Sequence, residues 1–216
     1  MRSKFDQQLD TLHTELIKLG ALCEEAIENI STALFNGDES LIEDAIRINE
    51  EIDNKERAVE RLCLKLLLRQ QPVASDLRQI SSALKMVTDM ARIGDQVADI
   101  AEIIKLDNIT AVNNVDISDM ARATVKMVTT AVDAFVHQNL ELAKSVIAYD
   151  DIVDGLFNKI KDELIELIVR DRQSGEYAID LLMTAKYFER IGDHAVNIAE
   201  WVVFAITGVH KGKRKI

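Results

Sequence analysis

Two pairs of carboxylates in the second half of the chain interrupt helix stripes that are otherwise apolar. One pair is Asp150 and Asp154, and the other is Glu189 and Asp193. The members of each pair are four residues apart, so they lie on one face of a helix. Because burying unpaired anions is costly, such groups must be protonated, paired with cations or bound to a metal. Four carboxylates on two facing helices form a set of hard oxygen ligands that suits Fe, Mn, Mg or, less distinctively, Zn.

The same spacing also has simpler explanations. Acid pairs one turn apart are common on helices. Arg190 or a lysine could neutralise these acids, or the stripe could lie at a solvated edge of the bundle. The recurrence of the pairs in both halves of the chain favours the metal site.

In the first half, this pattern is present as a weaker copy that lacks two of the four acids. The corresponding positions, in the same order, are Asn49, Asp53, Ala91 and Asp95. Asp99 and Glu102 extend the stripe of Asp95. These two acids either substitute for the missing ligands or form a solvated charged face.

The two halves are also related by a wider internal repeat. ARIGDQVADIAE at 91–102 and ERIGDHAVNIAE at 189–200 are identical at 7 of 12 positions, at an offset of 98. The stretches 49–53 and 150–154 align at an offset of 101. Such a repeat implies duplication, and we expect two similar helical bundles in tandem.

The elements that carry these residues are predicted to be long helices. Turn residues are sparse, with 1 Pro and 8 Gly, and only 5% of residues are aromatic, which argues against an all-β fold. Apolar residues recur every three or four positions, a spacing typical of antiparallel helix packing. The six predicted segments are 3–36, 38–70, 73–105, 117–137, 139–171 and 175–207.

Short connections between these segments predict an all-α protein of two three-helix bundles with up-down-up topology. We expect residues 1–107 to form the first bundle, 115–210 the second, and 211–216 a basic tail. The residues expected in the two cores are Leu16, Ile52, Leu84, Met127, Val153 and Leu182.

Charge and hydropathy limit the classes of partner. The chain has 26 Lys and Arg against 37 Asp and Glu, a net charge of −11. This balance argues against nucleic-acid binding and favours cations, metals or basic protein surfaces. No apolar run approaches the roughly 18 residues of a membrane span, and no signal peptide is evident. We therefore expect a soluble cytoplasmic protein, peripheral to the membrane at most, and a homodimer.

Several other residues that could do chemistry have structural explanations. Cys23 and Cys63 fall on apolar stripes and are expected to be buried. Gly94 and Gly192 lie inside predicted helices, where a glycine permits close packing. His194 should project about 100° away from Asp193, toward the surface. No nucleophile–histidine arrangement is present in the sequence, which gives hydrolase chemistry no support.

The motifs ERIGDHAVNIAE at 189–200 and RQQPVASDLR at 69–78, on a tandem pair of three-helix bundles, closely resemble the PhoU family of phosphate-transport regulators. The resemblance covers essentially the whole chain. It implies a non-enzymatic, cytoplasmic accessory protein of the Pst phosphate ABC transporter. It further implies that the protein acts on the transporter ATPase and the Pho sensor histidine kinase, as a negative regulator of phosphate uptake and of the phosphate-starvation response.

Several members of that family bind multinuclear metal clusters through paired Glu/Asp-x-x-x-Asp motifs. The resemblance implies that the second bundle holds metal through the four acids named above. In the first bundle Asn49 and Ala91 stand where acids are usual, which leaves Asn49, Asp53 and Asp95 as possible ligands. Two other classes stay open. One is a di-metal carboxylate oxidase of the ferritin-like kind, although position 192 is Gly where a Glu-x-x-His motif needs His. The other is a metal-free helical adaptor.

Overall fold

The computed structural model describes residues 2–69, 74–107, 115 and 117–210. Within these residues the chain forms six long α-helices, one 3₁₀ turn and no strand. The elements are α1 (Arg2–Asn36), α2 (Glu39–Arg69), α3 (Ala74–Asp107), α4 (Ser118–Val136), α5 (Leu140–Arg170), η1 (Arg172–Ser174) and α6 (Gly175–Thr207). Each predicted segment matches one helix to within two residues at either end, and the all-α prediction is confirmed. The turn η1 was not predicted, and the basic tail at 211–216 lies outside the described residues.

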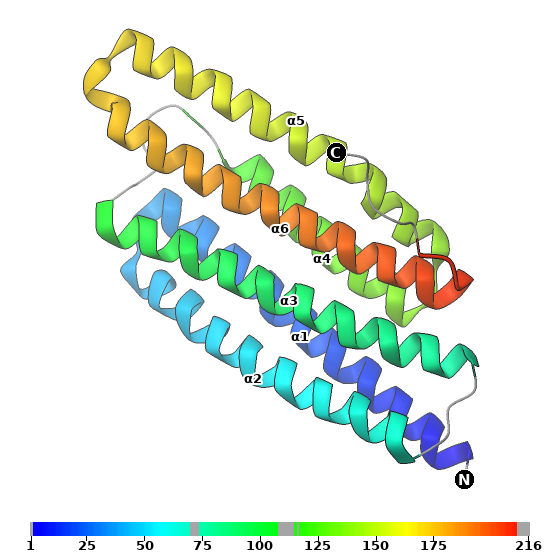
Figure 1. The fold of residues 1–216 in the computed structure, drawn as a ribbon. Helices are drawn as coiled ribbons and strands as arrows, with labels where there is room; N and C mark the ends of the chain where they lie inside the picture. Colours follow the sequence, from blue (N-terminus) through cyan, green and yellow to red (C-terminus); the bar gives the residue numbers. More distant parts are fainter. Residues whose placement is uncertain (1, 70–73, 108–114, 116, 211–216) are drawn as a thin grey trace.

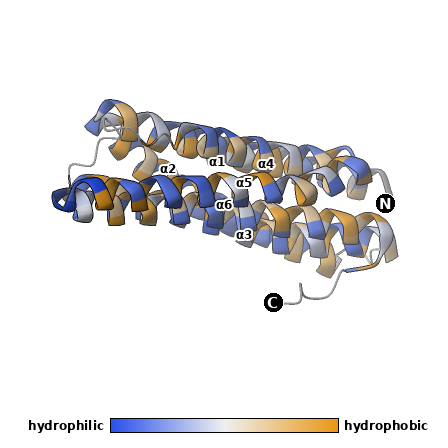
Figure 2. Ribbon diagram, turned by 90° about the horizontal axis from the view of Figure 1, so that it is seen from above, coloured by the Kyte–Doolittle hydropathy of each residue, from blue (hydrophilic) through white to orange (hydrophobic). Residues whose placement is uncertain are grey.

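The helices form two three-helix bundles that lie side by side (Figure 1). α1 to α3 make the first bundle and α4 to α6 the second, and the bundles meet where α1 packs on α4 and α3 packs on α6. α2 and α5 flank these pairs on opposite sides (Figure 1). Polar and apolar residues alternate along each rod (Figure 2), as expected for helices that bury one stripe. In the described part of the chain, no helix is apolar over enough of its length to cross a membrane.

Both junctions between the bundles are antiparallel. On α3 and α6, Arg78 donates to the Ala205 carbonyl at 3.3 Å, whereas Asp89, further along α3, contacts His194, which comes earlier in α6. The Arg78 guanidinium thus lies at the carboxyl end of α6, where a cation is favoured by the helix dipole. Next to it α6 ends at Gly208, whose φ of 76° is the left-handed conformation common at helix ends.

Most of the predicted core is buried, but two residues are not. Leu16, Ile52, Met127 and Val153 are at most 1% exposed. Two of the predicted core residues are only half-buried, and for them the prediction is wrong; these are Leu84 and Leu182. They occupy equivalent positions in the repeat, at the offset of 98. They lie on α3 and α6, which pack both within their own bundles and on each other.

Both cysteines are fully buried, as predicted. Burial raises the pKa of each thiol to about 12. The Cys23 thiol donates to the Met90 carbonyl at 3.6 Å, which links α1 to α3. Cys23 and Cys63 therefore act as small apolar side chains rather than as nucleophiles.

The repeat-related glycines differ in the space around them. A Cβ on Gly192 would lie 3.4 Å from Val153 Cγ1, an ordinary contact, whereas a Cβ on Gly94 would overlap Asn49 Oδ1 and lie 3.2 Å from Ile52 Cδ1. The close packing predicted for both positions is therefore much tighter at Gly94.

These environments predict opposite effects of alanine. Gly192→Ala is expected to raise the free energy of unfolding by up to about 1 kcal/mol, because alanine is the better helix former. Gly94→Ala is expected to be neutral or destabilising, because Asn49 must move and overpacking offsets the same gain. Urea unfolding of the two variants beside the parent measures the difference. Equal shifts in the same direction would contradict the prediction.

Candidate metal centre

The carboxylates of the second bundle gather around one close contact between α5 and α6. At this contact Val153 packs on Gly192, so the two helix backbones approach each other. The four predicted ligands, one pair on each helix, are Asp150, Asp154, Glu189 and Asp193. The structure thus brings both pairs to the same α5–α6 seam.

The four acids differ in exposure. Asp150 is 2% exposed, and the Glu189 side chain is 16% exposed. Asp154 and Asp193 reach solvent at the outer edge of the seam. The four acids therefore extend from the bundle interior to its surface. A metal-free adaptor is expected to have all four exposed, whereas only Asp154 and Asp193 are.

One lysine neutralises part of this cluster. Lys186, one turn before Glu189 on α6, forms an ion pair with it. Its ammonium also lies 5.4 Å from the centre of the Phe157 ring on α5. Arg190, the other expected cation, lies instead over the Tyr187 ring, 5.7 Å from its centre. The simpler explanation, pairing with a lysine, thus holds for Glu189.

The remaining acids repel one another. The pKa of Asp193 is raised, first by partial burial of its carboxyl and then by the charges of Glu189 and Asp150. Asp154 adds to this effect, and Lys186 opposes it. Glu189, Asp150 and Asp154 thus place negative charge around Asp193, and a bound cation would relieve this repulsion.

In the first bundle the corresponding acids are paired with arginines of their own helices. Asp95 accepts from Arg92 at 2.9 Å, and Arg57 lies 3.7 Å from Asp53. Both aspartate side chains are 40% exposed. Pairs of this kind lie at the surface and contribute little to stability.

The other two positions of the first bundle face inward. Asn49 Oδ1 is buried against Gly94 without a hydrogen-bond partner, and Ala91 is 7% exposed and supplies no ligand atom. The one neutral oxygen of this half thus points into the α2–α3 interface, away from the surface acids.

Asp99, a possible substitute ligand, lies in an acidic neighbourhood. Its pKa is raised by burial first and then by the charges of Asp95 and Glu102, while Arg190 lowers it. The three acids therefore interact electrostatically, and the cation that lowers the pKa of Asp99, Arg190, belongs to the second bundle.

The two halves fit a metal to different degrees. In the residues that the structure describes, no three histidine, cysteine, aspartate or glutamate side chains converge closely enough to hold an ion as they stand. The second bundle nevertheless has the right donor chemistry, because four carboxylates lie along one seam. The first bundle lacks two of these acids, and its Asp53 and Asp95 pair with arginines. The metal site stays a prediction.

Sequence analysis missed a polar cluster between the bundles. His194 Nδ1 lies 2.9 Å from Asp89 Oδ1, and the Asn197 amide donates to the same oxygen at 3.1 Å. The His194 side chain is 23% exposed, so its expected surface position is only partly right. The spacing of His194 and Asn197, three residues apart on one helix face, was the available signal.

The sequence of this chain is similar to a known protein family and to individual members of it. The PhoU domain model matches the chain twice, at residues 16–104 and 117–202. The chain is 35% identical over 210 residues to the phosphate-specific transport system accessory protein PhoU homolog of Clostridium acetobutylicum, covering 96% of each chain. It is 33% identical to the homolog of the same name from Pseudomonas aeruginosa, covering 95% of this chain and 86% of that one.

Two crystal structures show the same architecture. The structure of PhoU from Pseudomonas aeruginosa superposes with a TM-score of 0.88 at 32% identity, covering 95% of this chain and all of the other. The phosphate transport system regulatory protein PhoU from Streptococcus pneumoniae gives a TM-score of 0.85 at 27% identity, covering 95% and 98%. The likeness therefore extends over both bundles.

Proposed function

Because this chain belongs to the PhoU family, we propose that it is an accessory protein of a phosphate-specific transport system that restrains phosphate uptake. The observation that carries the proposal is the match over both bundles, since the family model matches each of them and the relatives named as accessory proteins align with 95–96% of this chain. A shared fold alone would not carry a function.

The finer proposal is that the protein acts through protein partners and not through catalysis. It binds the transporter ATPase and the sensor histidine kinase on the cytoplasmic side of the membrane, and so represses the phosphate-starvation response. The Streptococcus pneumoniae neighbour is named as a regulatory protein, which supports this class. The long helical faces and the excess of negative charge suit binding to basic protein surfaces.

The proposal includes a metal in the second bundle. Asp150, Asp154, Glu189 and Asp193 would hold it, with Lys186 released from Glu189. A bound cation supplies positive charge that offsets the four carboxylates and stabilises the folded bundle. Fe, Mn, Mg and Zn all accept such oxygen ligands.

Deletion of the gene tests the regulatory function. In phosphate-rich medium, the deletion strain is expected to keep phosphate uptake and phosphate-response genes active, because the restraint is gone. Uptake of radiolabelled phosphate and transcript levels measure this, with a plasmid-borne copy as the control. Normal uptake and normal expression, after removal of any second family copy, would refute the proposal. A pull-down from phosphate-replete cells, probed for the transporter ATPase and the kinase, tests the partners separately.

A further inference from the structure

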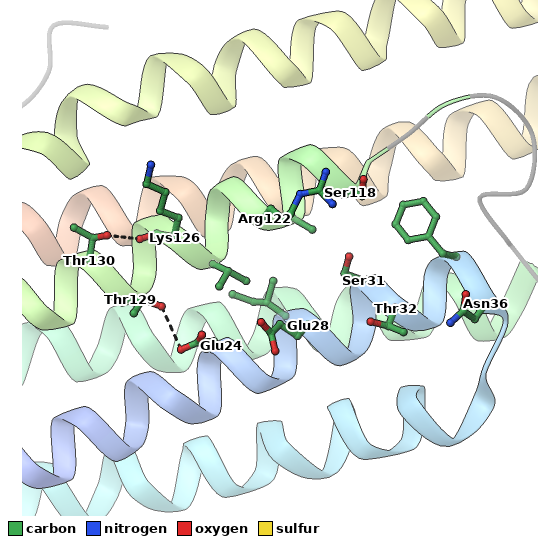
Figure 3. Close-up of a pocket in the computed structure, with 14 residues that line it drawn as sticks. Glu24, Glu28, Ser31, Thr32, Asn36, Ser118, Arg122, Lys126, Thr129 and Thr130 are labelled. Carbon is green, nitrogen blue, oxygen red and sulfur yellow. Dashed lines mark hydrogen bonds between the residues drawn. The ribbon is translucent and has the colours of Figure 1, made fainter.

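A groove lies at the second junction between the bundles, where α1 packs on α4. A Cβ on Gly20 of α1 would lie 2.9 Å from Val132 Cγ2 of α4, so the two helices pack closely there. One turn further on, Thr129 donates to Glu24 at 3.3 Å. Beyond this bond the helices border an open groove of about 820 Å³ (Figure 3).

The groove has an apolar floor, glutamates on its α1 wall and cations on its α4 wall, of which Lys126 extends away from α1 toward Tyr149 of α5 (Figure 3). Ile27 and Ala121 at its base are at most 3% exposed. The α1 wall bears two glutamates four residues apart and the α4 wall two cations four residues apart; they are Glu24, Glu28, Arg122 and Lys126. Figure 3 shows hydroxyl and amide side chains between and beyond these charges.

The charges on the α4 wall are held by weak contacts only. Arg122 pairs with Asp119 on its own helix, and both side chains are more than half exposed. The Lys126 ammonium lies over the Tyr149 ring, 4.5 Å from its centre. Exposed contacts of this kind contribute little and can be exchanged for a carboxylate of a bound partner.

We propose that this groove binds an amphipathic helix of a partner protein, one edge of which is basic and the other acidic. From Glu24 to Asn36 the groove follows thirteen residues of α1, whose twelve steps of 1.5 Å span about 18 Å. That length matches about three turns of helix. The charged residues on each wall are spaced one turn apart, so they can meet side chains at i and i+4 of the bound helix.

Other occupants fit this groove less well. A phosphate or another anion drawn to Arg122 would enter a groove that also bears Glu24 and Glu28, and a simple cation would enter one that also bears Arg122 and Lys126. A second copy of this chain would bring a concave surface against a concave surface and leave a large void between them, which costs packing. A helix that carries both basic and acidic side chains matches the concave shape of the groove and the charges of both walls. This inference does not depend on the proposed function.

Three designed peptides test the proposal. Each is a helical 14-mer with the same apolar stripe, and the two edges are basic and acidic, both basic, or both acidic. Binding to the full chain is measured by fluorescence anisotropy at physiological salt. The mixed-edge peptide is expected to bind at least tenfold more tightly than either of the others. Equal binding of the three, or tighter binding of either single-signed peptide, would overturn the proposal.

Charge reversal on one wall should switch this preference. Arg122→Glu with Lys126→Glu makes both walls acidic, so the both-basic peptide is expected to bind at least tenfold more tightly than the mixed one. Lys65→Glu with Lys85→Glu changes net charge equally at exposed positions outside the groove and should leave the original preference. An unswitched preference in the first variant, or a switch in the second, would refute the site.

Two further measurements separate folding and self-association from binding. Thr32→Trp at an exposed groove position should reduce mixed-peptide binding at least tenfold while circular dichroism stays unchanged. Sedimentation velocity of the parent and the charge variants should give one oligomeric state. A change of oligomeric state in the Arg122/Lys126 variant would assign the groove to a second copy and overturn the proposal.

Discussion

Glu189→Gln is expected to remove most of the metal that the purified protein carries, whereas Asp95→Asn removes little. Glu189 is a largely buried member of a four-carboxylate set, and its loss leaves three anions at the α5–α6 seam. Asp95 is 40% exposed and already pairs with Arg92. Because even the supporting partners of metal ligands are worth about tenfold to a hundredfold in affinity, we expect at least that loss for Glu189→Gln.

Elemental analysis of both variants, purified side by side without added metal, measures this asymmetry. Thermal unfolding with and without a chelator is the control for folding. Bound metal stabilises by about 2.7 kcal/mol at one hundred times its Kd, so Glu189→Gln should destabilise the metal-loaded protein more than the chelated one. In the chelated protein the lost pair with Lys186 is offset by weaker repulsion of Asp193. Equal metal loss from the two variants, or no metal in the parent, would contradict the site.

Phe135→Ala is expected to lower the free energy of unfolding by about 3–5 kcal/mol, the range for removing a buried aromatic ring. Phe135 on α4 is fully buried, and its ring meets His13 of α1 edge to face with centroids 5.6 Å apart. The substitution therefore opens a cavity at the junction between the bundles.

Urea unfolding monitored by circular dichroism measures that cost. Phe204→Ala on α6 is the matched control, because its ring is only half-buried and meets Trp201 at 5.8 Å. The control should lose clearly less stability. Equal losses would mean that the α1–α4 junction contributes no more than the edge of α6.

The helices themselves were predictable because each buries one regular stripe. The sparse turn residues divided the chain into six segments, the three- and four-residue spacing of apolar residues identified these as helices, and the repeat grouped them into two bundles. The docking of the bundles was not predictable in the same way. A stripe specifies one buried face, but α3 and α6 each pack on helices of both bundles. Leu84 and Leu182, which the stripes placed in the cores, are only half-buried.

Prediction of the candidate site was limited by the same distinction between local and distant contacts. The acid pairs were found because members four residues apart share a helix face. Lys186 lies three residues before Glu189 and carried a similar local signal. The link from Asp89 to His194 joins residues 105 positions apart, and no spacing in the sequence predicts such a pair.

The antiparallel junctions bear on how this chain arose. Residues 20 and 24 of α1 meet residues 132 and 129 of α4, and residues 78 and 89 of α3 meet residues 205 and 194 of α6. The first helix of one half therefore packs antiparallel on the first helix of the other half, and the third helix packs antiparallel on the third. This is the geometry of an isologous dimer, in which one surface is its own partner. An ancestral single bundle could have paired in this way before its two copies were joined in one polypeptide. Once joined, the copies no longer had to be identical, so one could keep four acids while the other acquired Asn49 and Ala91.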